Sequence, residues 1–271
     1  MNAVLVDGRQ AQSVACTDRG LLYGDGLFET ISCIDGRPRW LALHLQRLRS
    51  GLTRLRLPFR AFDALQSEIC SLAAGQQRCL VKVIVTRGAA PRRGYAPGGD
   101  EPPTRIVSRH EWPATNSSAT AFRVGLSEVR LGLNPMLAGM KHLNRLEQVL
   151  AQQACAETGL HEVLMLSATG QLISGSMSNV FLADEQGLVT PELRDCGVEG
   201  VMRRVVLDSA VSSGIAVRIG PVAASVLAGV REAFVTNVRL EVQSVNWLDG
   251  RVLPSDDYAR RLRQHIDAAR A

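Results

Sequence analysis

A chain of 271 residues exceeds the usual size of a single domain, so we expect two lobes with a ligand-binding cleft between them. Its 46% hydrophobic and 21% charged residues, with no apolar run of about 20 residues, exclude disordered and membrane-spanning proteins. The net charge of +5 comes from basic residues spread along the chain, and only 4% of residues are aromatic. That pattern argues against nucleic-acid binding and favours a small anionic substrate.

The amino terminus has no basic segment followed by an apolar stretch, so we expect a cytoplasmic protein without a targeting signal. The six cysteines are dispersed and form no C-x-x-C pair. This favours free thiols in a reducing compartment over a zinc site or a disulfide framework. The histidines His44, His110 and His142 lack metal-ligand spacing, and we assign them no role.

The first part of the chain predicts a small α/β lobe. Two strand patterns end in Asp-Gly turns at residues 7–8 and 35–36. Leucines at helical spacing then predict a helix that Pro58 closes. In chain order, the predicted elements are strands at 3–6 and 29–34, helices at 41–55 and 62–73, and strands at 79–86 and 104–108.

A stretch rich in Pro, Ser, Thr and Asn at 111–120 is the candidate linker. Beyond it the pattern predicts a larger mixed lobe, with strands at 122–127, 162–166, 179–182 and 233–236 and helices at 143–157, 201–212 and 256–269. We therefore expect an α+β protein, with a small N-terminal domain at residues 1–113 and a larger domain at residues 120–271.

The segment LAGMKHLNRLEQVLAQ (137–152) places Lys141 between a glycine-containing loop and a predicted helix. A lysine in such a place is commonly a solvated surface charge. Near a helix amino terminus, however, the positive end of the dipole disfavours the ammonium form, and the free amine becomes available for a Schiff base. Lys141 is therefore a candidate nucleophile.

Three segments are candidates for binding an anionic cofactor. Arg47 in HLQRL can donate two hydrogen bonds to a phosphate, although that segment alone fits the polar face of an amphipathic helix more simply. The turn at 197–200 opens onto a helix whose first backbone N–H groups can face an anion. Residues 236–238 end a strand, where backbone and side-chain donors can point into a cleft.

Seven motifs occur in the order seen in fold-type IV pyridoxal-phosphate enzymes, which include branched-chain and D-amino acid aminotransferases. They are DRGLLYGDGLFET (18–30), HLQRL (44–48), TRGAAPRRGY (86–95), LAGMKHLNRLEQ (137–148), SGSMSNVF (174–181), GVEGVMR (197–203) and TNV (236–238). The chain resembles this family over nearly its whole length. The run around Lys141 and the TRGAAPRRGY segment are most similar to the aminodeoxychorismate lyases of the family.

The resemblance implies a pyridoxal 5′-phosphate cofactor, bound in the larger domain and held covalently by Lys141. It also implies that Arg47, Val201, Met202 and Asn237 lie at the cofactor phosphate. Members of the family are homodimers, so a homodimer is expected, with a site near the domain interface to which the partner subunit can contribute.

One position departs from the family pattern. Most fold-type IV enzymes have a glutamate that faces the pyridine nitrogen in an E-G-x-x-x-N pattern, whereas this chain has Ser174 in S-G-S-M-S-N. A carboxylate would keep that nitrogen protonated and stabilise a carbanion far better than a hydroxyl does. Elimination to an aromatic ring has its own driving force, so Ser174 favours a lyase over a transaminase. The alternative is that Ser174 is only a turn residue.

The segment after the strand at 79–86 supplies candidate substrate contacts. Arg87, Arg92, Arg93 and Tyr95 lie among Gly and Pro residues, where side chains commonly line a site. The substrate that the resemblance suggests, 4-amino-4-deoxychorismate, is a small-molecule dicarboxylate, and arginine and tyrosine donors fit carboxylates. A solvated basic loop is the alternative interpretation.

The expected activity is the conversion of 4-amino-4-deoxychorismate to 4-aminobenzoate and pyruvate, a step of folate synthesis. The alternative within the family is a D-amino acid or branched-chain aminotransferase. A basic nucleic-acid-binding protein is the rival from another class, and no motif in the sequence supports it.

Overall fold

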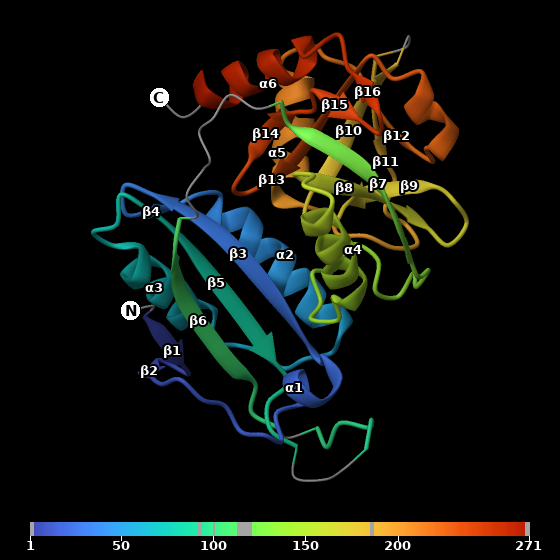
Figure 1. Cartoon of the computed structure of the whole chain (residues 1–271). Helices are drawn as coiled ribbons and strands as arrows, with labels where there is room; N and C mark the ends of the chain where they lie inside the picture. Colours follow the sequence, from blue (N-terminus) through green and yellow to red (C-terminus); the bar gives the residue numbers. More distant parts are fainter. Residues whose placement is uncertain (1–2, 91–93, 100, 113–120, 185–186, 269–271) are drawn as a thin grey trace. The chain divides into compact units, whose positions relative to one another are not determined.

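The computed structural model of the chain describes residues 3–90, 94–99, 101–112, 121–184 and 187–268 (Figure 1). Its contacts divide the chain into two compact units. Unit 1 comprises Met1–Asn116 and Met140–Asn144, and unit 2 comprises Ser117–Gly139 and Arg145–Ala271. The segment that contains Lys141 thus belongs to unit 1, although the predicted domain bounds place it in the larger domain.

Unit 1 is built on a six-stranded antiparallel sheet in the order β2-β1-β6-β5-β3-β4. The strands are β1 (Val4–Val6), β2 (Arg9–Gln10), β3 (Gly26–Ile34), β4 (Arg37–Pro38), β5 (Arg78–Thr86) and β6 (Thr104–Glu111). The helices are α1 (Arg19–Tyr23), α2 (Leu41–Arg54) and α3 (Phe62–Ala73). Strands β3 and β5, which pair with each other, are the longest of this sheet, with nine residues each.

Helices α2 and α3 pack on the sheet of unit 1 (Figure 1). Side chains alternate along each strand, so one face of the sheet carries the apolar residues that the helices cover. That face includes the buried residues Leu27, Ile31, Val81, Val83 and Val107. The opposite face, which carries the intervening side chains of β3, β5 and β6, is more polar.

The predicted Asp-Gly turns of unit 1 are confirmed. Asp7 and Gly8 have φ values of 49° and 81°, and Asp35 and Gly36 have φ values of 49° and 74°. Two successive positive φ values define the hairpin turn that matches the twist of the flanking strands. These turns fix the β1–β2 and β3–β4 hairpins.

Unit 2 contains two five-stranded sheets, in the orders β12-β11-β10-β13-β14 and β16-β15-β7-β8-β9. The strands are β7 (Arg123–Leu131), β8 (Glu162–Ser167), β9 (Leu172–Gly175), β10 (Asn179–Asp184), β11 (Gly187–Pro191), β12 (Val217–Gly220), β13 (Glu232–Asn237), β14 (Glu241–Ser244), β15 (Trp247–Leu248) and β16 (Arg251–Val252). The helices are α4 (Leu146–Glu157), α5 (Val201–Ser212), α6 (Asp257–Ala268) and the 3-10 helix η1 (Ala224–Ala228).

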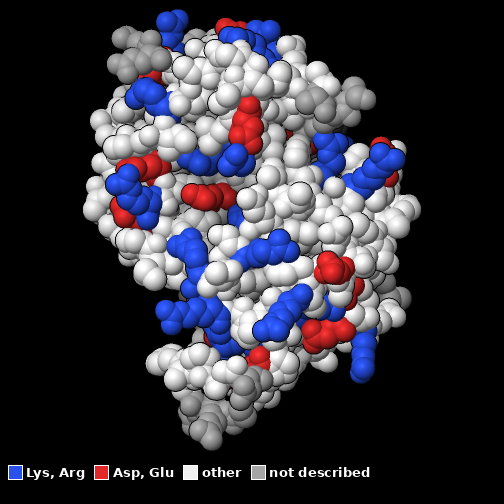
Figure 2. All heavy atoms as spheres, turned by 180° about the vertical axis from the view of Figure 1, so that it is seen from behind, with Lys and Arg blue, Asp and Glu red and all other residues white. Residues whose placement is uncertain are grey.

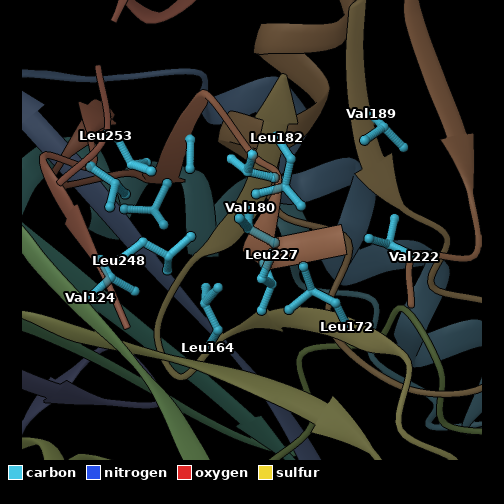
Figure 3. Packing of buried hydrophobic residues seen from close by; sticks show 14 of the residues in the cluster. Val124, Leu164, Leu172, Val180, Leu182, Val189, Val222, Leu227, Leu248 and Leu253 are labelled. Carbon is cyan, nitrogen blue, oxygen red and sulfur yellow. The ribbon is translucent and has the colours of Figure 1, made fainter. Parts of the chain in front are cut away.

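The core of unit 2 joins its two sheets. Val124 and Leu164 of one sheet share a buried cluster with Val180 and Leu182 of the other (Figure 3). Between these two residues of β10, Phe181 points to the other face of the sheet and stacks on Phe234, with ring centroids 4.9 Å apart. Helices α5 and α6 pack on β13 and β14, and α4 packs on β7 and β8.

The predicted α+β class is confirmed, and two predicted helices, α3 and α5, have the predicted bounds. The helix predicted from Leu143 begins instead at Leu146, because residues 140–144 follow the sheet of unit 1. Several short strands were not predicted, among them β9, β11 and the β15–β16 hairpin. They are too short to show an alternating pattern that stands out in the sequence.

Candidate active site

Lys141 lies beside the first residues of β3 in unit 1. The backbone N–H of Phe28 donates to the Lys141 carbonyl at 2.9 Å, and the N–H of Leu143 donates to the Gly26 carbonyl at 3.1 Å. The Lys141 Nζ lies 4.2 Å from the centre of the Phe28 ring. The segment is therefore fixed to the sheet, and its amine rests over an aromatic face.

Two glycines permit this close approach of segment 140–144. Gly24 has a φ of 66°, and a Cβ there would lie 2.4 Å from the side-chain oxygen of Asn144. A Cβ at Gly26 would lie 2.9 Å from Leu143 Cδ1. The glycines of the YGDGLFET run thus admit the segment that carries Lys141.

The prediction that a helix dipole acts on Lys141 is wrong. Helix α4 begins at Leu146, with Arg145 at its N-cap, and it belongs to unit 2. The dipole effect fades within the first turn of a helix, and Lys141 precedes that turn by five positions.

A buried carboxylate links β3 to α2. Glu29 is 2% exposed. Its Oε1 accepts a hydrogen bond from Arg47 Nε at 2.8 Å. Its Oε2 accepts a hydrogen bond from His44 Nδ1 at 2.6 Å and also pairs with Arg47 Nη2. The predicted phosphate contact Arg47 is therefore neither a solvated side chain nor a freely rotating one. Its guanidinium is oriented by Glu29 from the neighbouring strand.

Charge balance explains the ionisation of this cluster. Burial by itself raises the pKa of Glu29, but the charge of Arg47 and the hydrogen bonds from His44 and Arg47 outweigh burial and hold that pKa at about 2. Burial lowers the pKa of His44, and the charges of Arg47 and Lys141 lower it further against the pull of Glu29. His44 is thus a neutral ring that donates from Nδ1, and within the described residues its buried Nε2 has no partner.

The predicted substrate contact Arg87 is engaged inside unit 1. It donates to Asp25 from Nε at 2.8 Å and to the carbonyls of Leu55 and Arg56 at the end of α2, at 2.9 and 3.0 Å. Arg19 donates to the same Asp25 carboxylate at 2.9 Å. Burial raises the pKa of Asp25, yet hydrogen bonds from Arg87 and Arg19 outweigh it and lower that pKa. A substrate contact by Arg87 stays an untested prediction.

The other predicted substrate contacts follow Arg87 in the TRGAAPRRGY segment. Arg92 and Arg93 lie outside the described residues. Tyr95 is 86% exposed, and its ring centroid lies 5.4 Å from that of Tyr23. The Tyr95 carbonyl accepts a hydrogen bond from Arg19 at 2.7 Å, so the same arginine that neutralises Asp25 anchors this loop.

In unit 2, the amino terminus of α5 forms an anion-binding shape. Gly200 is the N-cap, and no side chain caps the helix. The Gly200 N–H, which was expected to face an anion, instead donates to Asn179 Oδ1 at 3.1 Å, and a Cβ at Gly200 would lie 2.1 Å from that oxygen. The N–H groups of Val201 and Met202 follow, at the positive end of the helix dipole.

The Thr236 hydroxyl is a further hydrogen-bond donor close to the amino terminus of α5. It sits on β13 directly opposite Asn179 of β10, the residue that holds Gly200. Its side chain is 1% exposed, and among the described residues its Oγ1 has no hydrogen-bond partner. A buried hydroxyl without a partner costs free energy, so a ligand group there would satisfy it.

The side chain of Asn237 shapes a turn. Its Oδ1 accepts hydrogen bonds from the N–H groups of Arg239 and Leu240 at 2.9 and 2.8 Å, and its Nδ2 donates to the Met177 carbonyl at 3.3 Å. Both polar atoms of the Asn237 side chain, Oδ1 and Nδ2, are therefore already engaged within unit 2.

Ser174 lies on β9, opposite Met165 of β8, and is 8% exposed. Nearby, the buried carboxylate of Glu162 accepts hydrogen bonds from the N–H groups of Ser176 and Met177 at 3.0 and 3.2 Å and from Ser178 Oγ at 2.7 Å. Glu162 thus fixes the shape of the S-G-S-M-S-N loop. Ser174 stands in a strand rather than in that turn.

Sequence reasoning missed the carboxylates that position the predicted residues, namely Glu29, Asp25 and Glu162. A signal was present for Glu29. Glu29 lies two residues from both Leu27 and Ile31 along β3, so it shares their face of the strand. That face is buried, and a buried charge needs a partner.

Other kinds of site find no support in the described part of the chain. There, no three His, Cys, Asp or Glu residues are grouped to hold a metal ion. No described helix is both long and apolar enough to cross a bilayer. On the face shown in Figure 2, basic side chains are separated by uncharged surface and by acidic side chains.

Residues 26–248 match the family described as Amino-transferase class IV. The chain is 32% identical to an aminodeoxychorismate lyase from Vibrio harveyi over 243 residues, 89% of each chain. It is 29% identical over 256 residues to a putative branched-chain-amino-acid aminotransferase from Methanocaldococcus jannaschii, across 93% of this chain and 88% of that one.

A solved structure shows the same likeness. The crystal structure of 4-amino-4-deoxychorismate lyase from Pseudomonas aeruginosa superposes with a TM-score of 0.92 at 40% identity, covering 98% of both chains. The chain therefore belongs to the class IV aminotransferase family of fold-type IV enzymes, whose members depend on pyridoxal 5′-phosphate.

Proposed function

We propose that this chain is a pyridoxal-phosphate-dependent lyase that converts 4-amino-4-deoxychorismate to 4-aminobenzoate and pyruvate. The likeness to the Pseudomonas aeruginosa lyase over 98% of both chains, at 40% identity, carries this proposal. Ser174 adds to it, because a hydroxyl in place of a glutamate disfavours transamination more than it disfavours an elimination that forms an aromatic ring.

The residues present fit the cofactor phosphate. The uncapped amino terminus of α5 at Val201 and Met202 offers N–H groups, and the buried Thr236 hydroxyl lacks a partner among the described residues. We assign Arg47 and Asn237 to the same phosphate, and Lys141 to the covalent link. When bound, pyridoxal phosphate supplies an electron sink for the substrate carbon that bears the amine.

Lys141 is the proposed acid and base. With the cofactor bound, the amine of Lys141 would remove the ring proton at the carbon that bears nitrogen. Loss of the enolpyruvyl group then leaves an aromatic ring. Lys141 delivers a proton to the departing enol, so the products are 4-aminobenzoate and pyruvate. Arg93 and Tyr95 are the proposed contacts of the substrate carboxylates.

An assay of the purified enzyme tests the proposal. Incubation with chorismate, glutamine and an aminodeoxychorismate synthase should yield 4-aminobenzoate and pyruvate. Borohydride reduction beforehand should abolish the product and leave a pyridoxyl group on the peptide that contains Lys141. Synthase alone is the control for background formation of product.

The alternative activity within the family is an aminotransferase. The 29% identity to the Methanocaldococcus jannaschii relative supports this alternative. A D-amino or branched-chain amino acid supplied with 2-oxoglutarate separates the two activities, because only a transaminase makes glutamate. Glutamate without any 4-aminobenzoate would replace the lyase proposal with the aminotransferase one.

A homodimer in the cytoplasm completes the proposal. Helix α4 exposes Leu146, Val149 and Leu150, with Leu146 77% exposed, and apolar surface of this kind marks contacts with another chain. The six cysteines are all free thiols, as suits a reducing compartment.

A further inference from the structure

The two lysines of this protein lie on one aromatic ring. The sequence has 31 lysine and arginine residues, and only Lys82 and Lys141 among them are lysine. The Lys82 Nζ lies 5.6 Å from the centre of the Phe28 ring, and the Lys141 Nζ lies 4.2 Å from the same centre. The two lysine side-chain amines of the chain thus both lie at the Phe28 ring in unit 1.

Lys82 stands on the face of the sheet opposite α2 and α3. In the ladder it is the direct neighbour of Thr30 on β3 and of Ser108 on β6. Ser108 Oγ is 2.8 Å from His110 Nε2, which belongs to the same face. The strand period also places Phe28 there, so the face combines an ammonium, hydroxyls and an aromatic ring.

This face offers no carboxylate to Lys82. Near Lys82, strands β3, β5 and β6 place no Asp or Glu on this face of the sheet. The neighbouring side chains on the face are Phe28, Thr30, Ser32, Leu80, Ile84, Ile106, Ser108 and His110. Within the described residues, Lys82 makes neither an ion pair nor a side-chain hydrogen bond. Three arginines of unit 1 behave differently, since Arg19, Arg47 and Arg87 each pair with a carboxylate. The charge of Lys82 is left for a ligand.

We infer that Lys82 binds a carboxylate of the substrate whose amine reacts at Lys141, and that it selects dicarboxylates over simple amino acids. The inference rests on the proposed function. A compact ammonium with three donors suits a carboxylate approached from several directions, and Thr30 and Ser108 add hydroxyl donors beside it. Phe28 offers a flat apolar surface for a six-membered ring.

The test replaces Lys82 by methionine, which keeps much of the side chain's volume and removes its charge. In the cofactor-loaded enzyme, Lys82→Met should raise KM for 4-amino-4-deoxychorismate roughly tenfold or more, while kcat changes less than about threefold. Chorismate, a dicarboxylate that lacks the amine, serves as a binding probe without turnover. Its Kd, measured by calorimetry, should rise by a similar factor.

Two further variants separate binding from folding. Lys82→Arg keeps the positive charge and should retain a KM closer to that of the wild type. Arg109→Met removes a cation from the adjacent strand β6, but on the helix-covered face, because Arg109 pairs with Val81 rather than with Lys82. It should leave KM and the Kd for chorismate unchanged. Cofactor absorbance and the thermal midpoint of each variant report on its fold.

The outcomes distinguish this inference from the proposed function. An unchanged KM and chorismate Kd in Lys82→Met, with active wild type, overturns the inference and leaves the lyase proposal standing. An equal loss in Arg109→Met overturns it too, since a general charge effect would then explain the result. If the wild type makes no 4-aminobenzoate, the lyase proposal fails, and the chorismate titration alone decides the role of Lys82.

Discussion

At the scale of single residues, one buried and one half-buried carboxylate decide where the cations of unit 1 point. Glu29 fixes Arg47, and Asp25 fixes Arg87 and Arg19. Removing one partner of a buried ion pair leaves the other charge uncompensated, which costs about 3–5 kcal/mol. Each carboxylate is therefore a positioning residue for the arginine that it holds.

Arg47→Ala is expected to weaken cofactor retention and leave the chemistry intact. A bidentate phosphate contact would be lost, so the purified variant should carry less pyridoxal phosphate, and excess cofactor should partly restore its rate. Absorbance of the bound cofactor after dialysis measures the effect. A variant that keeps the cofactor and turns over normally would limit Arg47 to its pairing with Glu29.

Acid should unfold the protein partly through Glu29 and His44. The pKa of Glu29 is about 2 in the folded chain against an ordinary 4.5, so its stabilisation is present above pH 4.5 and is lost as the pH falls toward 2. The folded pKa of His44 is lowered, so falling pH below about 6.5 also destabilises. In urea unfolding, the difference between wild type and Glu29→Gln should narrow from pH 5 to pH 2, to within roughly 1 kcal/mol. A constant difference would contradict the assignment.

Ser174→Glu tests the preference for elimination over transamination. If Ser174 faces the pyridine nitrogen, a carboxylate there should favour the protonated ring and stabilise carbanions. Side transamination should then rise several-fold relative to lyase activity, and the cofactor spectrum should change when an amino acid is added. Ser174→Ala should keep much of its elimination rate. An unchanged spectrum and activity ratio in a folded Glu variant would show that Ser174 does not touch the ring.

At the scale of elements, helix starts and strand ends form the proposed phosphate site. The amino terminus of α5 is held by Asn179, which is paired with Thr236 across β10 and β13. Three elements distant in sequence thus meet through one amide side chain. The donors are rigid because they belong to a helix end and a strand rather than to a loop.

Thr236→Val isolates the unpartnered hydroxyl. Affinity for pyridoxal phosphate should fall roughly threefold to tenfold, while the apoprotein should be no less stable, because no hydrogen bond within the described residues is lost. Thr190→Val is the matched control. Thr190 donates to the Val180 carbonyl at 2.8 Å, so its loss should cost about 1 kcal/mol of stability and leave affinity unchanged. Cofactor titration and chemical unfolding measure the two effects.

Element prediction succeeded where one pattern dominated. Helices α3 and α5 followed their apolar spacing, whereas the helix expected from Leu143 lost its first turn because that stretch hydrogen-bonds to β3. No local pattern reports a competing tertiary contact. Placing Lys141 on the sheet of unit 1 required the structure.

At the scale of the whole molecule, the proposed homodimer gives the exposed apolar side chains of α4 a partner. Leu146→Glu should shift the protein from dimer to monomer in light scattering, because a buried unpaired charge opposes association. Val211→Glu is the control, since Val211 is 81% exposed on α5 and belongs to a different surface. A Leu146→Glu dimer, or a monomeric wild type, would contradict the assignment of α4.

The sequence by itself determined the fold class, the family resemblance and the identity of the candidate lysine, because periodicity, turn signals and ordered motifs are local properties. Only the tertiary structure decided what surrounds those residues. It paired Arg47 with Glu29, committed Arg87 to Asp25, and brought Lys82 to the ring under Lys141. A side chain's partner depends on strand register and on helix packing, and these join positions far apart in the chain that no local pattern relates.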